Sequence, residues 1–412
     1  MGTLRSQAKQ PEVSGPPFVR RLGVLDWIAI IFAVLGLLAV ATGLVPIPAA
    51  AGTVRRLLPL LIFLGSVIVL AELTAAAEVF DVIAARLART ARGNYFALFL
   101  MCVGFASITT ATLNLDTTAV LLTPVMLATA VRIGMPKTPL AMTTVWLANT
   151  ASLLLPVSNL TNLLAMNRVQ LSSSQFAARL WLVELASVAA TMACLWLFYW
   201  RRGARHEDRY PPPSPYRPRD RSLFVVAAGS CVIFVVGLLV GVPIQLVSPA
   251  CMAVVLLAFA VRHRAVLTPR MIPWQLLAFV TGLFLTVDAI TAHGLAGMLR
   301  SLVGDDTGPW GTLRAAGIGA VLSNAGNNLP AYVAIEAVIP ASQATHDQLL
   351  GLLIGTNVGP LITPWASLAT LIWYARCRGY GVDISWPRFL LTGTVTAFVA
   401  LSAATGVLIL TR

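Results

Sequence analysis

The sequence predicts an all-α polytopic membrane protein with an inverted-topology repeat, two re-entrant hairpins and two broken transmembrane helices, about 9–11 spans in all. Three observations predict this fold. The 412 residues are 58% hydrophobic and only 11% charged, whereas soluble domains have about 25% charged residues. Apolar runs of membrane-spanning length follow one another along the whole chain. Polar motifs interrupt these runs at matching places in the two halves.

Most of the apolar runs are expected to cross the membrane completely. The expected full spans are 24–44, 57–77, 138–168, 178–200, 222–242, 246–262, 272–290, 347–376 and 388–410. Two further runs, 94–134 and 310–340, are split in the middle by polar residues. Each is therefore expected to be a re-entrant hairpin that enters and leaves on one side of the membrane.

The distribution of Arg and Lys predicts the orientation of the chain. Basic residues concentrate in 1–22, 78–93, 132–137, 201–221, 262–270 and 376–388. Because cytoplasmic loops carry an excess of Lys and Arg, we expect a multi-pass protein of the cell (plasma) membrane with its N-terminus in the cytoplasm. This use of Arg also accounts for the net charge of +13, so nucleic acid is not an expected partner.

The expected domain organisation follows from these segments. The only long hydrophilic connection, at 201–221, is rich in Arg and Pro and is expected to be a flexible cytoplasmic linker. It separates two membrane units. The predicted divisions are a cytoplasmic N-terminal tail at 1–22, a first transmembrane repeat at 23–200, the linker at 201–221 and a second transmembrane repeat at 222–412.

The two halves contain similar polar motifs. Moving 148–162 onto 356–370 superposes Asn149 on Asn357, Pro156 on Pro364, Asn159 on Ser367 and Asn162 on Thr370. An odd number of crossings separates the corresponding spans, so the halves are expected to have opposite orientations, as in many secondary transporters. Backbone freed by a helix break is tolerated at membrane depth only where it is buried in protein or lines a wet cavity.

Amide and hydroxyl side chains, which both donate and accept hydrogen bonds, gather at the two hairpin tips and the two helix breaks. The expected substrate- or ion-binding residues are Asn114, Asp116, Thr117, Thr118, Asn149, Ser152, Ser158, Asn159, Thr161, Asn162, Ser323, Asn324, Asn327, Asn328, Thr356, Asn357, Thr363, Ser367 and Thr370. Such a site suits a small, oxygen-rich solute that is neutral or anionic, and it lacks an Arg clamp for phosphate or dicarboxylate. The alternative role for individual Ser and Thr residues is in helix caps and interhelical hydrogen bonds.

Asp116 is the only carboxylate in these four motifs. Because burying an ionisable group in the membrane is costly, it is a candidate to bind and release a proton or to coordinate Na⁺. If Na⁺ is the coupling ion, Asn159 and Asn328 are the other expected ligands. The alternative is a capping carboxylate at the hairpin tip. No cofactor or further metal is expected, and the absence of GxxxxGK[ST], HExxH, CxxC and GxSxG argues against an enzyme.

Four stretches also resemble a known group of carriers: "LDTTAVLLTPV" (115–125), "ANTASLLLPVSNLTNLL" (148–164), "LSNAGNNLPAY" (322–332) and "GTNVGPLITPWASLATLIW" (355–373). At these motifs the chain resembles the ion transporter superfamily, most closely the arsenite permease family and then the citrate/dicarboxylate and Na⁺/H⁺ carriers. Leu115 separates Asn114 from Asp116, whereas the family's tip motif commonly has Asn and Asp adjacent. Neither tip has the Ser-Asn-Thr of the dicarboxylate branch.

The resemblance implies a scaffold domain, a transport domain, alternating access and a homodimer. It favours secondary active efflux of arsenite or antimonite coupled to the proton gradient. The alternatives are a Na⁺-coupled carboxylate or anion carrier, a Na⁺/H⁺ antiporter, and a membrane scaffold or receptor without transport activity. The expected partners are a small-molecule or ion substrate and the lipid bilayer. The sequence leaves open whether a soluble ATPase also associates.

Overall fold

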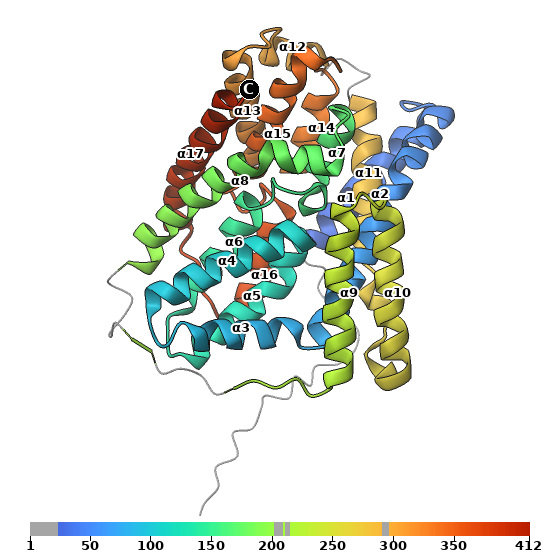
Figure 1. Cartoon of the computed structure of the whole chain (residues 1–412). Helices are drawn as coiled ribbons and strands as arrows, with labels where there is room; N and C mark the ends of the chain where they lie inside the picture. The colour runs from blue at the N-terminus through green and yellow to red at the C-terminus, as the bar shows by residue number, and fades with distance from the viewer. Residues whose placement is uncertain (1–23, 202–208, 211–214, 291–295) are drawn as a thin grey trace, which may run out of the picture.

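The computed structural model describes residues 24–201, 209–210, 215–290 and 296–412, so the predicted tail at 1–22 lies outside the described residues. Within these ranges the chain is helical, and the β structure consists of one isolated bridge between Asn94 and Arg209. The helices form two bodies, one on each side of the molecule in Figure 1. The predicted all-α membrane fold is confirmed.

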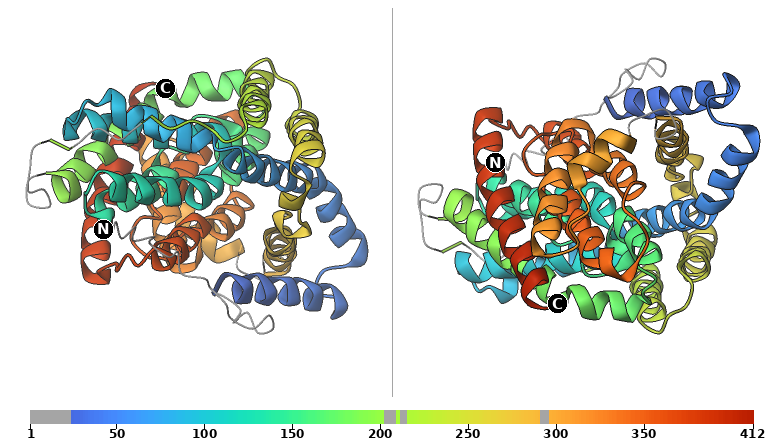
Figure 2. Two further views of the ribbon diagram at one scale, coloured as in Figure 1. Left: turned by 90° about the horizontal axis from the view of Figure 1, so that it is seen from below. Right: turned by 90° about the horizontal axis from the view of Figure 1, so that it is seen from above.

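The first body consists of outer spans. Its helices are α1 (Val24–Ala41), α2 (Ile47–Ala76), α9 (Arg221–Leu239), α10 (Ile244–Arg262) and α11 (Trp274–Ile290), with the short turns η3 (Arg264–Val266) and η4 (Pro269–Met271) before α11. α1 packs on α11, and α10 packs on α2 and α9. Gly36 and Gly282 let α1 and α11 approach so closely that a Cβ on Gly36 would lie 2.7 Å from the Gly282 carbonyl oxygen. Figure 2 shows α1, α2, α10 and α11 on one side of the molecule from both ends.

The second body contains the hairpins and the broken helices. Its first-half elements are α4 (Tyr95–Leu113), α5 (Leu115–Arg132), α6 (Lys137–Thr150), η1 (Pro156–Ser158), α7 (Leu160–Arg168) and α8 (Ser173–Leu195), which η2 (Trp196–Trp200) continues. Its second-half elements are α13 (Pro309–Gly326), α14 (Asn328–Glu336), η6 (Gln343–Thr345), α15 (His346–Val358), α16 (Leu368–Gly379) and α17 (Trp386–Leu410). The expected hairpins at 94–134 and 310–340 are therefore α4–α5 and α13–α14.

Corresponding helices of the two halves run in opposite directions. Arg179, early in α8, donates through Nη1 to the carbonyl oxygen of Thr411, just beyond α17, at 2.6 Å. Tyr199, at the end of α8–η2, shares a hydrogen bond of 2.9 Å with Thr392, early in α17. The short amphipathic helices α3 (Val79–Thr90) and α12 (Ala296–Val303) lie at opposite ends of the molecule in Figure 1. Both observations fit an inverted repeat.

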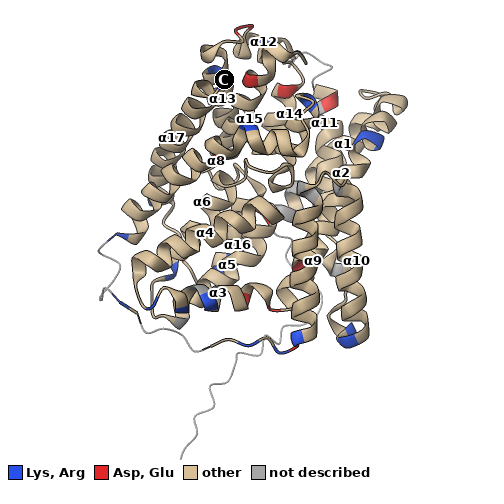
Figure 3. Cartoon of the chain, in the orientation of Figure 1, with Lys and Arg blue, Asp and Glu red and all other residues tan. Residues whose placement is uncertain are grey.

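The surface of the helices suits contact with lipid. Five helices of the described ranges are long and apolar enough to cross a membrane: Ile47–Ala76, Tyr95–Leu113, Ser173–Trp200, Gln245–Arg262 and Trp386–Leu410. Val261 and Phe398, for example, are 86% and 72% exposed. In Figure 3 the charged residues gather near the two ends of the molecule, where polar headgroups lie.

A stripe of glycines holds α15 against α13. Gly351, Gly355 and Gly359 recur every four residues along one face, and a Cβ on Gly355 would overlap the carbonyl oxygen of Ala316 on α13. Because glycine has no side chain, the two helix backbones can approach closely, as is common in membrane helices. The corresponding first-half positions on α6 hold larger residues, including Thr143 and Leu147. The two halves therefore share an architecture but pack differently.

The described part of the 201–221 connection contacts the first repeat. Tyr210 is buried, its hydroxyl donates to the carbonyl oxygen of Ala88 at 2.6 Å, and its backbone N–H donates to the carbonyl oxygen of Gly93 at 3.0 Å. Arg219 forms an ion pair of 3.4 Å with Glu78. A simple flexible tether would not require these contacts, so at Tyr210 and Arg219 the connection is fixed rather than free.

Candidate functional site

Both hairpins reverse direction at a single asparagine. α4 ends one residue before Asn114 and α5 begins one residue after it, and Asn327 occupies the same place between α13 and α14. Their φ angles are 96° and 112°, values that residues other than glycine rarely adopt. The side-chain oxygen of Asn114 accepts from the N–H of Thr117 at 2.8 Å and thereby caps α5. The short amide side chain helps to stabilise a conformation that would otherwise be strained.

Both broken helices stop and restart at corresponding positions. The first break spans 151–159, between α6 and α7, and the second spans 359–367, between α15 and α16. Asn159 caps α7 through the N–H of Thr161 at 3.3 Å, and Ser367 caps α16 through the N–H of Thr370 at 3.1 Å. Each break therefore brings a helix amino end, with its partial positive charge, to the middle of the second body.

Asn357 joins the two halves of the chain. Its Oδ1 accepts from Asn159 Nδ2 at 2.9 Å and from Thr161 Oγ1 at 2.7 Å. Its Nδ2 donates to Asn162 Oδ1 at 2.7 Å. All four residues were predicted site residues from opposite halves, and all four are buried. The structure therefore brings this part of the predicted set into one hydrogen-bond network.

A second side-chain hydrogen bond connects the two halves at the corresponding positions. Asn149 is the first-half counterpart of Asn357, and Thr370 is the second-half counterpart of Asn162. Asn149 Nδ2 donates to Thr370 Oγ1 at 3.4 Å, a longer contact than the 2.7 Å between Asn357 and Asn162. The contact between the two halves is thus pseudo-symmetric, with one short hydrogen bond and one long hydrogen bond.

The tip of the second hairpin is bound to the second break. Asn324 Nδ2 donates to the carbonyl oxygen of Gly359 at 2.8 Å, and Asn324 Oδ1 accepts from the N–H of Thr363 at 3.0 Å. Asn327 Nδ2 donates to the carbonyl oxygen of Trp365 at 3.0 Å. These bonds make the tip and the break one structural unit.

Two further bonds connect tips and breaks. In the first half, Ser158 Oγ donates to the carbonyl oxygen of Ala111 at the end of α4, at 2.8 Å. In the second half, the backbone N–H of Asn328 donates to the carbonyl oxygen of Ala366 at 2.8 Å. Each hairpin thus contacts the broken helix of its own half.

Several predicted hydroxyl residues donate only within their own segment. Their side chains donate to carbonyl oxygens three or four residues earlier, which is neither a helix cap nor an interhelical hydrogen bond. They are Thr118, Ser152, Ser323 and Thr356.

Three buried oxygen atoms of the predicted set have no hydrogen-bond partner within the described ranges. They are Asp116 Oδ1 and Thr117 Oγ1, at the start of α5, and Asn149 Oδ1, near the end of α6. α5 and α6 pack against each other. Buried polar atoms normally have partners, so unmet acceptors mark a place where a bound solute or ion could contribute hydrogen bonds or charge.

Two residues outside the predicted set also shape the site. Glu184 of α8 is buried, and its Oε2 accepts from the N–H of Leu153 in the first break at 3.0 Å. Trp365 in the second break is 50% exposed, and its Nε1 donates to the carbonyl oxygen of Asn324 at 2.9 Å. An acid inside an apolar span was the only sequence signal for Glu184, and a Trp beside Pro364 was the only one for Trp365.

None of the five cysteines lies in a tip or a break. All are free thiols, and Cys102, Cys194, Cys251 and Cys377 are buried. Within the described ranges, no group of three His, Cys, Asp or Glu side chains could hold a metal ion.

Comparison with known proteins decides the family. A family model described as "Citrate transporter" matches residues 22–370, which is most of the chain. The chain belongs to the citrate transporter family. The predicted resemblance to the ion transporter superfamily is therefore confirmed, and this family member is a multi-pass membrane transporter rather than an enzyme.

Two sequence relatives of this citrate transporter family member are named as arsenical pump proteins. It is 30% identical over 403 residues to the "Arsenical pump membrane protein" of Escherichia coli, which covers 92% of each chain. It is also 30% identical over 362 residues to the protein of the same name from Yersinia enterocolitica, which covers 82% of this chain and 84% of that one. The predicted likeness to arsenite permeases thus has support among sequence relatives.

A solved structure shares the fold. The YdaH transporter of Alcanivorax borkumensis, whose crystal structure has an unusual topology, superposes with a TM-score of 0.56 and covers 94% of this chain and 97% of its own. Its sequence identity is 14%, so the likeness concerns the fold.

Proposed function

We propose that this transporter exports arsenite or antimonite by alternating access and that the proton gradient drives the export. Near neutral pH such a solute is largely an uncharged species with three hydroxyl groups. The unmet oxygen atoms Asp116 Oδ1, Thr117 Oγ1 and Asn149 Oδ1, on two helices that pack together, can accept hydrogen bonds from such hydroxyl groups, and this is the observation that carries the proposal. The names of the sequence relatives support it.

Asp116 is the proposed proton-coupling group. It is buried, and its side chain forms no ion pair with a basic residue of the described ranges. A carboxylate in such a place is strongly destabilised unless a proton, a cation or hydrogen-bond donors compensate its charge. We propose that proton binding and solute binding alternate at Asp116, so that each step of the cycle leaves the site without an uncompensated charge.

The proposed function also includes roles for the two bodies, a homodimer and an orientation in the membrane. The body of α1, α2, α9, α10 and α11 acts as the scaffold and forms the homodimer, and the second body moves against it. The arginines at the start of α9 and the end of α10 lie at the same end of the molecule as α3 (Figure 3), which supports placing that end and the N-terminus in the cytoplasm.

Uptake by inside-out vesicles tests this proposal. Vesicles with the wild-type protein should accumulate arsenite when their interior is acidified, and an uncoupler should stop the uptake. Asp116→Asn should abolish it, whereas Asp305→Asn, a change at an exposed loop residue, should leave it intact. Normal uptake by Asp116→Asn, or none by wild-type protein verified in the membrane, would refute the proposal.

A Na⁺-coupled carrier of citrate or another carboxylate is the second candidate. The family description favours it, and unmet oxygen acceptors would also suit Na⁺, with Asp116, Asn159 and Asn328 as the expected ligands. Citrate uptake that requires a sodium gradient, in the same vesicles and without arsenite uptake, would select this alternative.

A further inference from the structure

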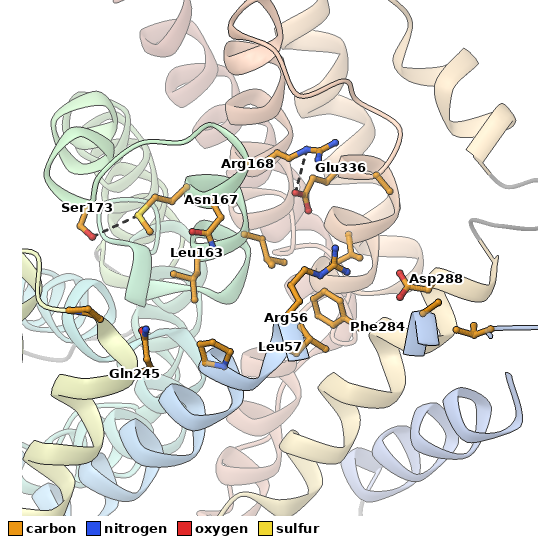
Figure 4. A pocket seen from close by; sticks show the side chains of 18 of the residues that line it. Arg56, Leu57, Leu163, Asn167, Arg168, Ser173, Gln245, Phe284, Asp288 and Glu336 are labelled. Atoms are coloured by element: carbon orange, nitrogen blue, oxygen red, sulfur yellow. Dashed lines mark hydrogen bonds and ion pairs between the residues drawn. The ribbon is translucent and has the colours of Figure 1, made fainter. Parts of the chain in front are cut away.

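A large cavity lies between the two bodies, away from the tips and breaks. Its volume is about 910 Å³, within the usual range for ligand sites. α2, α10 and α11 contribute to one wall, and α7 and α14 contribute to the other. Figure 4 shows the side chains that line it.

Four charged residues line the cavity, two from each body. On the second body, Arg168 Nε lies 3.9 Å from Glu336 Oε1, and Arg168 Nη2 donates to the carbonyl oxygen of Ile339 at 3.0 Å. Arg168 Nε is buried and has no hydrogen-bond partner within the described ranges. Both walls of the cavity therefore carry polar groups that a ligand could engage.

The two scaffold charges are also only partly compensated. The charge of Arg56 acts on the Glu336 carboxylate of the second body. Asp288 of α11 accepts one hydrogen bond through Oδ2, from Thr53 Oγ1 at 2.6 Å. Arg56 of α2 is exposed and forms neither an ion pair nor a hydrogen bond with any described residue. A guanidinium offers five N–H donors and pairs well with phosphate. The cavity thus presents a cation and an anion, both with capacity for a ligand of opposite charge.

Apart from Asn167, Ser173 and Gln245, the rest of the lining is apolar, and it includes exposed residues at the ends of the membrane helices. Leu57, Leu163 and Phe284 form part of the inner wall. Leu44 and Val242, which also line the cavity, are 49% and 40% exposed and belong to the connections between membrane helices. The cavity therefore opens near the ends of the membrane helices, and its apolar inner wall suits an acyl chain.

Three of the four charged residues lie at helix ends, where lipid headgroups lie. Arg168 and Glu336 are the last residues of α7 and α14, and Asp288 lies in the last turn of α11. Long basic side chains at helix ends commonly reach the membrane interface. A lone anion in the cavity would be opposed by Asp288, and a lone cation would be opposed by Arg56, so a ligand with both charges fits best.

We propose that this cavity binds a zwitterionic phospholipid with a primary ammonium group, an ethanolamine phospholipid. Arg56 binds its phosphate, Asp288 accepts hydrogen bonds from its ammonium group, and its acyl chain lies along Leu57 and Phe284. A lipid bound there lies between the scaffold and the second body and contacts both. The proposal does not depend on which solute the protein carries.

Native mass spectrometry of the purified full-length chain tests this inference. The protein is equilibrated in separate mixed micelles with phosphatidylethanolamine, phosphatidylcholine or phosphatidylglycerol, and also with soluble phosphoethanolamine. We expect one tightly bound phosphatidylethanolamine per chain. The choline lipid should bind more weakly because its quaternary ammonium has no N–H, and the glycerol lipid should bind more weakly because it lacks an ammonium. Equal binding of the three lipids, or tighter binding of soluble phosphoethanolamine than of the lipid, would overturn the proposal.

Two substitutions and a matched control locate the site. Arg56→Gln should weaken phosphatidylethanolamine binding about tenfold, which corresponds to about 1.4 kcal/mol, because the charge-assisted hydrogen bonds to the phosphate are lost. Asp288→Asn should remove the preference for phosphatidylethanolamine over phosphatidylglycerol. Arg55→Gln removes an equally exposed neighbour that does not line the cavity and should have no effect. An unaltered affinity in Arg56→Gln, or equal losses in Arg55→Gln and Arg56→Gln, would place the lipid elsewhere and refute the assignment.

Discussion

Asn357 and Asn162, which are far apart in the sequence, form a hydrogen bond of 2.7 Å that connects the two halves of the chain. The other side of the Asn357 amide accepts from Asn159 and Thr161. One side chain therefore satisfies three buried partners, and the two repeats depend on it for their central contact.

Asn357→Ala should destabilise the protein strongly. It leaves up to three buried polar groups without a partner, and each such group costs about 1–3 kcal/mol. The temperature of unfolding in detergent, followed by tryptophan fluorescence, should fall well below that of the wild type.

Asn149→Ala is the matched control at the counterpart position. Its amide makes only a 3.4 Å contact across the halves, and its Oδ1 has no partner among the described residues. We expect a smaller loss of stability and a larger loss of solute affinity. If Asn149→Ala proved the more destabilising of the two, the assignment of Asn357 as the central contact would be wrong.

Gly355→Ala should separate α13 from α15. The new Cβ would overlap the carbonyl oxygen of Ala316, and the backbone there cannot move without moving a helix. Such overpacking costs about 1–3 kcal/mol. Gly317→Ala on α13 places its Cβ in open space and should be neutral or slightly stabilising, because Ala favours helix over Gly. Equal unfolding temperatures for the two variants would contradict this account of the packing.

Substitutions of Glu184 should distinguish a positioning role from a proton-carrying role. Glu184→Gln keeps an oxygen that can accept from the N–H of Leu153, so the first break should stay in place and transport should persist. Glu184→Leu leaves this buried N–H unpaired, at a cost of about 1–3 kcal/mol, and should impair both stability and transport. Complete loss of transport in Glu184→Gln, at normal stability, would show that the carboxyl proton itself is needed.

Tyr210 should make stability depend on pH at the alkaline end. Burial raises the pKa of the Tyr210 phenol to about 12, whereas in the unfolded chain it is about 10. Because the folded state holds the proton more tightly, this contribution is complete below pH about 10 and is lost as pH rises towards about 12. Tyr210→Phe lacks both the titration and the bond to Ala88. The stability difference between wild type and this variant should therefore be constant up to pH about 10 and then shrink. A difference that stayed constant to pH 12 would contradict the burial of this phenol.

The hairpins and breaks could be predicted from sequence because polar residues inside apolar runs are costly and therefore informative. The pattern placed the reversals near Asn114 and Asn327, and the structure shows helix ends at both. The positive φ angles at these residues could not be predicted, since asparagine only tolerates such a conformation and the packing of the two arms imposes it.

The sequence also could not show which polar side chains connect the two halves and which donate within their own helix. Asn357 and Thr356 are neighbours with similar chemistry, yet one connects the halves and the other donates within its own helix. Which neighbour faces the other repeat depends on the rotation of α15 about its axis, which the glycine contacts with α13 help to fix. Glu184 was missed because its partner is a backbone N–H in a distant loop, and no side-chain pattern records such a contact.

The placement of the five thiols has a practical consequence. Trivalent arsenic forms strong bonds to sulfur, so a site lined with cysteine would retain the proposed solute instead of releasing it in each cycle. The free thiols lie outside the tips and breaks, and four of them are buried. In a variant with Cys231 replaced by Ser, a single cysteine introduced at Thr363 would therefore be a suitable target for a maleimide reagent, and its labelling from either side of a vesicle would report which side the pathway faces.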